Sequence, residues 1–156
     1  MSDSPTIPIQ YLDTMVSIEQ ILQEDTIVVL SNKTLFCHYL YTIGNIDFNC
    51  PEFLIFCNEE QRIHYSYILT EYSDHIRNNE APPKSHKQFK FHQEKFYPIQ
   101  IDMTLVCQFA GVLKRHYPTM PKIPMTQLLL PDKSGRYPQD HLYNNVFNKQ
   151  PLLVGN

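Results

Sequence analysis

Glycine and tryptophan are scarce in this sequence. Its 156 residues include four glycines and no tryptophan, whereas glycine makes up roughly 7% of an average protein. The chain contains no G-x-G-x-x-G, G-x-x-x-x-G-K-[ST] or G-x-S-x-G sequence, and no H-E-x-x-H. A standard dinucleotide loop, a P-loop, a hydrolase nucleophile elbow and a zinc-protease helix are therefore excluded.

An excess of positive charge is also missing. The formal net charge is −3, whereas non-specific nucleic-acid binders usually carry a basic surplus. The most basic stretch, residues 84–95, mixes lysines with phenylalanines, which also suits stacking on single-stranded bases. Phe89 and Phe91 alternate with Gln88 and Lys90 at the period of a strand, so we favour a half-buried strand with solvated lysines and expect no nucleic-acid partner.

Long apolar runs and clustered cysteines are absent as well. No segment approaches the ~20 apolar residues of a membrane helix, and the first ten residues lack the apolar core of a signal peptide. The cysteines (Cys37, Cys50, Cys57 and Cys107) are too few and too scattered for a secreted disulfide scaffold. We expect a cytoplasmic protein without membrane contact; export to a host by a dedicated secretion system would leave no readable signal.

The apolar periodicity predicts both strands and helices. Residues 1–12 form an arm or an edge strand, and residues 13–156 form a single domain. Helices are predicted near 15–22, at 58–78 and at 102–116, where Asp102 is the cap. Strands are predicted at 26–30, 35–43, 53–57, 88–91, 97–101 and 126–130. The strand at 53–57 is apolar on both faces and is predicted to be central.

The order of these elements predicts the fold class. Strands and helices mix without a regular alternation of the βαβ type. We therefore expect an α+β fold, in which about three helices accompany a mixed or mostly antiparallel twisted sheet. A sheet covered on one face would account for both kinds of strand pattern.

Several short segments resemble the motifs of one family. Tyr41-Thr42-Ile43-Gly44 is followed, after a short loop, by Pro51-Glu52 and an apolar strand. Residues 127–138 read QLLLPDKSGRYP, and Gln150-Pro151 lies near the end. The order and spacing of these segments, over about residues 18–155, resemble the bacterial domain-of-unknown-function 4262 family.

The resemblance implies a set of residues but no reaction. The polar side chains of Thr42, Gln127 and Gln150, together with Arg136, are the candidate ligand contacts. The sequence departs from the family pattern at Asn45 (usually Leu), at Cys50 (usually His), and at Leu130 and Gln139 (both usually Trp). If the family's function relies on that histidine or those tryptophans, this chain has lost or altered it.

The Pro-Asp-x-x-Gly-Arg segment predicts a tight turn. Asp132 would cap backbone amides there, and Gly135 would take a positive φ, as would Gly44 in the earlier segment. Arg136 would project from this turn, either to clamp an anion or to pair with Asp132 or Glu52 inside the fold. We favour the internal pair.

Two sets of side chains are candidates for catalysis. Glu52 and Asp132 would suit acid–base hydrolysis if both faced one cleft. We favour the alternative, in which an internal salt bridge to Arg136 orders two loops. Cys50 with His38 is a candidate nucleophile pair. The alternative is that His38 is a histidine on a strand that only packs against its neighbours. The cysteine and histidine spacings do not match a zinc site, so we expect no metal and no cofactor.

Two functions remain open at this point. The first is a non-catalytic binding or regulatory module, which contacts a protein (in bacterial conflict or host interaction) or a small anionic ligand. The alternative is a small-molecule hydrolase or transferase, with Arg136 as anion clamp and Glu52 or Asp132 as acid or base. The lack of a recognisable catalytic motif favours the first. The partner, the ligand and the oligomeric state stay open.

Overall fold

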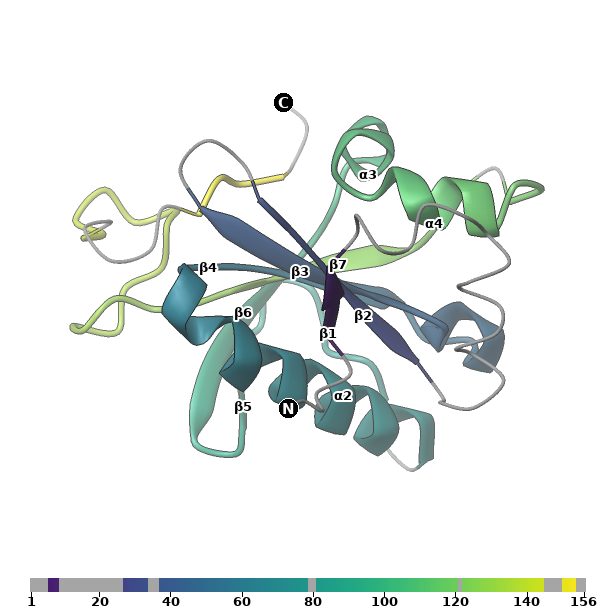
Figure 1. Cartoon of the computed structure of the whole chain (residues 1–156). Helices are drawn as coiled ribbons and strands as arrows, with labels where there is room; N and C mark the ends of the chain where they lie inside the picture. Colours follow the sequence, from purple (N-terminus) through teal and green to yellow (C-terminus); the bar gives the residue numbers. More distant parts are fainter. Residues whose placement is uncertain are drawn as a thin grey trace.

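Seven strands form the sheet at the centre of the molecule (Figure 1). The computed structural model describes residues 6–8, 27–33, 37–78, 81–120, 122–144 and 150–153, so the helix predicted near 15–22 lies outside the described residues. The strands are β1 (Thr6–Pro8), β2 (Val28–Lys33), β3 (His38–Ile43), β4 (Glu52–Cys57), β5 (Phe89–Phe91), β6 (Glu94–Gln100) and β7 (Met125–Leu129).

The strand order is β1-β2-β3-β4-β7-β6-β5, and the sheet is mixed. The β1–β2 and β4–β7 pairs are parallel, and the other neighbouring strands run antiparallel. β4 lies at the centre, as its apolar sequence predicted, and all of its residues are buried. Together with the helices, this sheet makes a single α+β domain and confirms the predicted fold class.

Helices cover both faces of the sheet (Figure 1). α2 (Arg62–Asn78) packs on one face, and α3 (Met103–Phe109) and α4 (Gly111–His116) pack on the other. The prediction of a sheet covered on one face is therefore wrong. β3 and β4 carry apolar residues at successive positions, so each face of the sheet must be buried. None of the helices in the described part of the chain is long and apolar enough to cross a membrane.

α2 follows a short 3₁₀ turn, η3 (Glu59–Gln61), that carries a reciprocal cap. Oδ1 of Asn58 accepts a hydrogen bond from the Gln61 amide at 2.9 Å, and Oε1 of Gln61 accepts one from the Asn58 amide at 3.1 Å. The predicted stripe of the helix is buried against the sheet; it consists of Tyr65, Ile68, Leu69, Tyr72 and Ile76.

The helix predicted at 102–116 is divided into α3 and α4. Asp102 caps α3 as predicted, because its Oδ1 accepts a hydrogen bond from the Thr104 amide at 2.9 Å. The backbone then leaves helical geometry at Ala110, with φ −130° and ψ 50°. The hydroxyl of Tyr39 donates to the Phe109 carbonyl at 2.9 Å. A side chain from the sheet thus satisfies a carbonyl at the break.

The basic stretch forms a β-hairpin of β5 and β6 that packs against α2. Phe89 stacks on the ring of Tyr72 with 5.1 Å between centroids, and Phe91 contacts the same ring at 5.0 Å. Lys90 between them is exposed. The half-buried strand with solvated lysines is therefore confirmed.

Candidate ligand-binding site

Glu52 begins β4 and lies in a buried polar cluster. Its carboxylate is 0% exposed and accepts a 2.6 Å hydrogen bond from the Thr42 hydroxyl. The backbone amides of Gly44, Asn45 and Ile46 donate to the same carboxylate at 3.0, 3.3 and 3.2 Å. Gly44 has a φ of 123°, as predicted, and the turn that it makes directs successive amides toward one anion.

Two kinds of influence act in opposite directions on the pKa of Glu52. Burial raises the pKa of Glu52 from 4.5 to about 7, while the Thr42 hydroxyl and the three amides lower it. Tyr117 lies nearby and donates to Oδ2 of Asp47 at 3.4 Å; burial and then the charges of Glu52 and Asp47 raise the pKa of Tyr117. The contacts of Glu52 therefore organise the connection between β3 and β4.

Gln127 and Gln150 attach the segment 150–153 to β7. Nε2 of Gln127 donates to the Pro151 carbonyl at 2.7 Å, and its Oε1 accepts from the Leu153 amide at 2.9 Å. Gln150 makes the same pair of contacts with Leu130, 2.8 Å in each direction. Each glutamine thus pairs with the backbone as a neighbouring strand would. Both amides are engaged inside the protein.

Asp132 holds the predicted turn after β7. Its carboxylate accepts from the backbone amides of Ser134, Arg136 and Asn144 at 2.8, 2.9 and 3.0 Å. These amides, that of Asn144 foremost, lower the pKa of Asp132. Gly135 has a φ of 84°, as predicted. Asp132 is therefore an ionised structural anchor for the turn.

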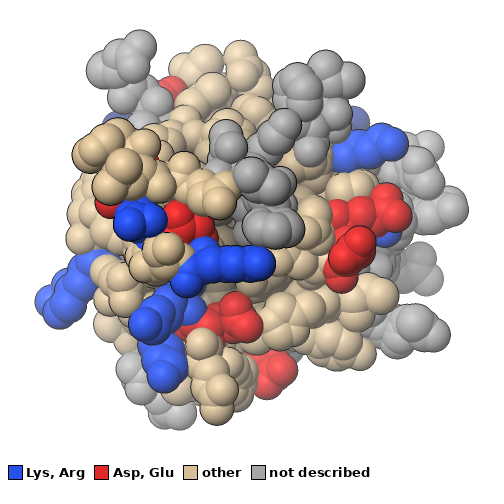
Figure 2. Space-filling view, turned by 90° about the vertical axis from the view of Figure 1, so that its left-hand side faces the viewer, with Lys and Arg blue, Asp and Glu red and all other residues tan. Residues whose placement is uncertain are grey.

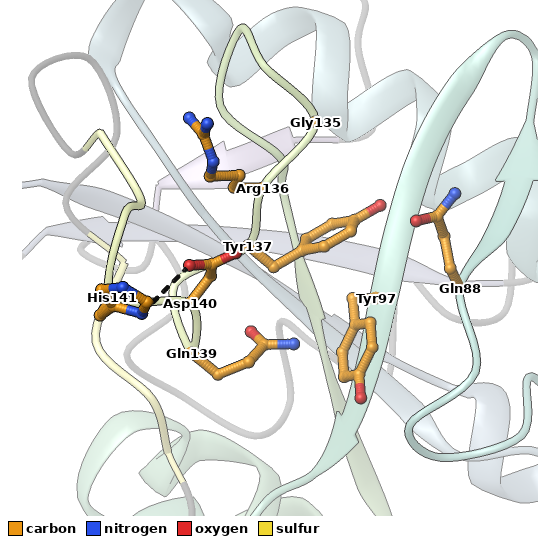
Figure 3. A pocket seen from close by; sticks show the side chains of 8 residues that line it. All are labelled: Gln88, Tyr97, Gly135, Arg136, Tyr137, Gln139, Asp140 and His141. Carbon is orange, nitrogen blue, oxygen red and sulfur yellow. Dashed lines mark ion pairs between the residues drawn. The ribbon is translucent and has the colours of Figure 1, made fainter.

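Arg136 lies at an open hollow beside this turn (Figure 3). The hollow has a volume of about 580 Å³ and is bounded by residues 135–141 and by the β5–β6 hairpin. Arg136 is half-buried, and its charge helps to lower the pKa of Asp132. Among the described residues no carboxylate lies within ion-pair distance of its guanidinium. The hollow is lined by Gln88, Tyr97, Gly135, Arg136, Tyr137, Gln139, Asp140 and His141.

Charges of both signs lie around this hollow. Asp140 lines it, accepts from the Leu142 amide at 2.9 Å, and pairs with His141 at 3.7 Å. Lys133 and Lys87 are exposed on the adjoining segments. The space-filling view of this side of the molecule shows most of its lysine and arginine side chains on the left half of the face and a further one at the upper right, with carboxylates on both halves (Figure 2).

Tyr137 places a buried hydroxyl at the hollow. The residue is 7% exposed, and its hydroxyl has no hydrogen-bond partner among the described residues. Its ring packs on Tyr97 with 5.3 Å between centroids and extends toward the side that carries Gln88 (Figure 3). Burial raises the pKa of Tyr137 to about 12, so the hydroxyl is a neutral donor at physiological pH.

Residues 21–144 match the family model of a domain of unknown function, DUF4262. The chain belongs to the DUF4262 family. The suspected family is confirmed, and the match includes the Tyr-Thr-x-Gly, Pro-Glu and Pro-Asp-x-x-Gly-Arg segments but ends before Gln150. No curated protein and no solved structure matches the chain.

The structure of this DUF4262 protein places the two candidate acids at opposite ends of the sheet. Glu52 is in register with Met125, the first residue of β7, and Asp132 follows the last residue of the same strand, Leu129. At ~3.3 Å per residue, β7 alone separates them by about 13 Å. Arg136 lies with Asp132 at the far end from Glu52. The structure therefore does not gather Glu52, Asp132 and Arg136 in one cleft.

Cys50 and His38 are also separated. Cys50 lies just before β4, whereas His38 is in register with Cys57 at the other end of that strand. Burial raises the pKa of the Cys50 thiol, which opposes thiolate formation, and His38 contacts Glu59 at 3.4 Å. Within the described residues, no three His, Cys, Asp or Glu side chains are grouped as metal ligands would be.

The sequence reasoning found Arg136 but missed its neighbours at the hollow. Tyr137 belongs to the same motif and offered a signal, because an aromatic residue follows the Arg in the family pattern. Tyr97 lies on β6, about forty residues earlier in the chain, and Gln88 directly precedes β5. No spacing connects those residues to the turn; the antiparallel pairing of β6 with β7 brings them together.

Proposed function

We propose that this DUF4262 protein is a binding module that holds an anionic group of its ligand at Arg136. The observation that supports this most is that Arg136, a half-buried residue, lines an open hollow and has no carboxylate of the described residues in ion-pair distance. Guanidinium groups bind carboxylate and phosphate through paired donors, and partial burial strengthens the attraction. We keep a bacterial, cytoplasmic setting as part of this proposal.

The placement of the candidate acids favours binding over acid–base catalysis. Glu52 accepts hydrogen bonds from one hydroxyl and three amides inside the fold. Asp132 accepts three backbone hydrogen bonds. A general acid or base must lie within hydrogen-bond reach of the reacting group, and Glu52 is buried at the other end of the sheet. Of the two partners expected, we favour a small anion, because Arg136 lines a hollow of about 580 Å³, which is large enough to hold one.

The test is an amide-NMR titration of the ¹⁵N-labelled chain with acetate and with inorganic phosphate at constant ionic strength. We expect saturable shifts at residues 135–141 and at Gln88 and Tyr97. The variant Arg136→Gln should weaken binding at least tenfold. Arg115→Gln, on α4, is the matched control because it removes an exposed arginine that does not line the hollow.

Two results would overturn the proposal. One is the absence of saturable shifts at the hollow with both anions. The other is an affinity that falls equally in Arg136→Gln and in Arg115→Gln, which would indicate a general charge effect. Thermal unfolding of each variant, compared with the unaltered chain, separates loss of binding from loss of structure.

A further inference from the structure

A second, apolar pocket adjoins the hollow at Arg136. It has a volume of about 240 Å³ and shares two wall residues, Tyr97 and Gln139, with the larger hollow. Its remaining wall consists of His86, Ile99, Leu129 and Leu152. Tyr97 thus forms a partition, with a polar compartment that carries Arg136 and Asp140 on one side and an almost entirely apolar one on the other.

We propose that the ligand is an amphiphilic organic anion, whose carboxylate or phosphate lies at Arg136 and whose apolar chain or ring enters the pocket beside Leu152 and Ile99. This inference rests on the proposed function, because it adds a second contact to the same ligand. Two adjoining compartments of opposite character recognise a molecule that has both characters, as ligand sites combine apolar walls with a few placed polar groups.

The floor of the apolar pocket is rigid. Ile99 is 4% exposed and Leu129 is 0% exposed, and both lie in the paired strands β6 and β7. A cavity of about 150 Å³ lined by aliphatic and aromatic side chains is large enough to bind benzene. The pocket here is larger, so a ring or a short alkyl chain fits within it.

Leu152 is held at the rim of this pocket. It is 38% exposed, although its neighbours in the chain are fastened: Gln127 binds the Pro151 carbonyl and the Leu153 amide. The side chain therefore presents apolar surface to solvent from a backbone that is already ordered. A ligand that covers it gains hydrophobic burial without ordering the segment.

The polar compartment offers a second donor besides Arg136. The hydroxyl of Tyr137 is buried and has no partner among the described residues, and Gln88 and Gln139 carry amides on the same wall. A buried hydroxyl without a partner is costly, and an acceptor on the ligand would satisfy it. This observation is independent of the guanidinium and also indicates a ligand.

The test compares a series of straight-chain anions by NMR titration: acetate, hexanoate and decanoate, with inorganic phosphate and hexyl phosphate as a second series. Each methylene buried in an apolar site improves affinity about fourfold, so three buried methylenes already exceed tenfold. We expect decanoate to bind at least tenfold more tightly than acetate. The two series distinguish a carboxylate from a phosphate as the preferred anionic group.

Two leucine variants provide the matched pair. Leu152→Gln should remove most of the gain from the alkyl chain and leave acetate binding unchanged. Leu142→Gln is the control, because Leu142 is 57% exposed and lines neither compartment. Arg136→Gln should weaken the short and the long anions alike. Tyr137→Phe should weaken all of them and leave the contribution per methylene unchanged.

The outcomes separate the two proposals. If acetate and decanoate bind equally and both depend on Arg136, the amphiphilic ligand is overturned and the anion-binding module stands. If decanoate binds equally well to Arg136→Gln, or if Leu142→Gln and Leu152→Gln weaken it equally, the chain binds non-specifically and the inference is overturned. If no anion of either series binds, both proposals fail.

Discussion

The hydroxyl of Thr42 donates a 2.6 Å hydrogen bond to Oε1 of Glu52, and both side chains are completely buried. The Thr42 oxygen also accepts from the Phe53 amide at 2.9 Å. The first two segments of the family pattern therefore meet at one carboxylate. Their role in this chain is to join β3 to β4 through a buried cluster.

Replacing Glu52 with Gln should destabilise the protein by about 2–3 kcal/mol at neutral pH. A hydroxyl and three amides donate to the carboxylate, and an amide nitrogen in its place leaves some of these buried donors without an acceptor. Urea unfolding measures the change. Glu59→Gln, which alters an exposed acid that contacts His38, should stay within ~0.5 kcal/mol. A Glu52 variant as stable as the Glu59 variant would contradict the structural role.

The stability of the protein should also depend on pH through Glu52. Because its pKa is raised from 4.5 to about 7 on folding, the folded state binds the proton more tightly than the unfolded state. The resulting stabilisation is complete below pH 4.5 and is lost as the pH rises to about 7, by about 3 kcal/mol in all.

This pH dependence is measured as the difference in unfolding free energy between the unaltered chain and Glu52→Gln from pH 4.5 to pH 7.5. The comparison cancels every contribution that the two proteins share. The ordinary pKa values of Cys50 and Tyr117 already lie above pH 7.5, and burial raises both pKa values further. A difference that stays constant with pH would show that Glu52 does not titrate there.

Two glycine variants should change stability in opposite directions. Gly135 has a φ of 84° and no atom within 4 Å of an added Cβ. Alanine there should therefore cost only the backbone strain, about 1 kcal/mol. Gly111 also has nothing within 4 Å and begins α4, so alanine should stabilise the protein by up to ~1 kcal/mol. Thermal unfolding of both variants checks the signs; a stabilising Gly135→Ala would contradict the strain at the turn.

Removing the Tyr137 hydroxyl should leave the free protein as stable as before, or stabilise it by up to ~1 kcal/mol, because a buried hydroxyl without a protein partner is unfavourable. Tyr143→Phe is the comparison: its hydroxyl accepts a 2.7 Å hydrogen bond from Gln150, and its loss should cost about 1 kcal/mol. Urea unfolding without ligand distinguishes the two. Equal destabilisation by both would indicate that the Tyr137 hydroxyl has a structural partner.

Strong local patterns predicted much of the fold. The doubly apolar segment at 53–57 is the central strand, and the stripe of α2 faces the sheet from its Asn58 cap onward. Boundaries were less exact: the strand predicted at 26–30 is found at Val28–Lys33, and that predicted at 35–43 begins at His38. The division of residues 102–116 escaped prediction; in the structure Tyr39, a side chain of the sheet, donates to the Phe109 carbonyl beside the break.

The candidate site was harder to predict from the sequence. The family-like segments identified Thr42, Glu52, Gln127 and Gln150 as polar residues worth attention, but sequence alone does not say where their hydrogen bonds go. In the structure those bonds are internal. The hollow at Arg136 depends on the β6–β7 pairing, which brings Tyr97 beside the turn. Such a neighbour arises from topology and leaves no local pattern.

The amide of Gln150 has a practical consequence for work with this family. The family match ends at residue 144, yet Gln150 satisfies both backbone groups of Leu130, and Leu153 is 3% exposed in the core beside α3. A fragment cut at residue 144 would expose a polar seam along β7 and remove one wall of the apolar pocket. The segment that must be expressed together is longer than the segment that family comparison recognises.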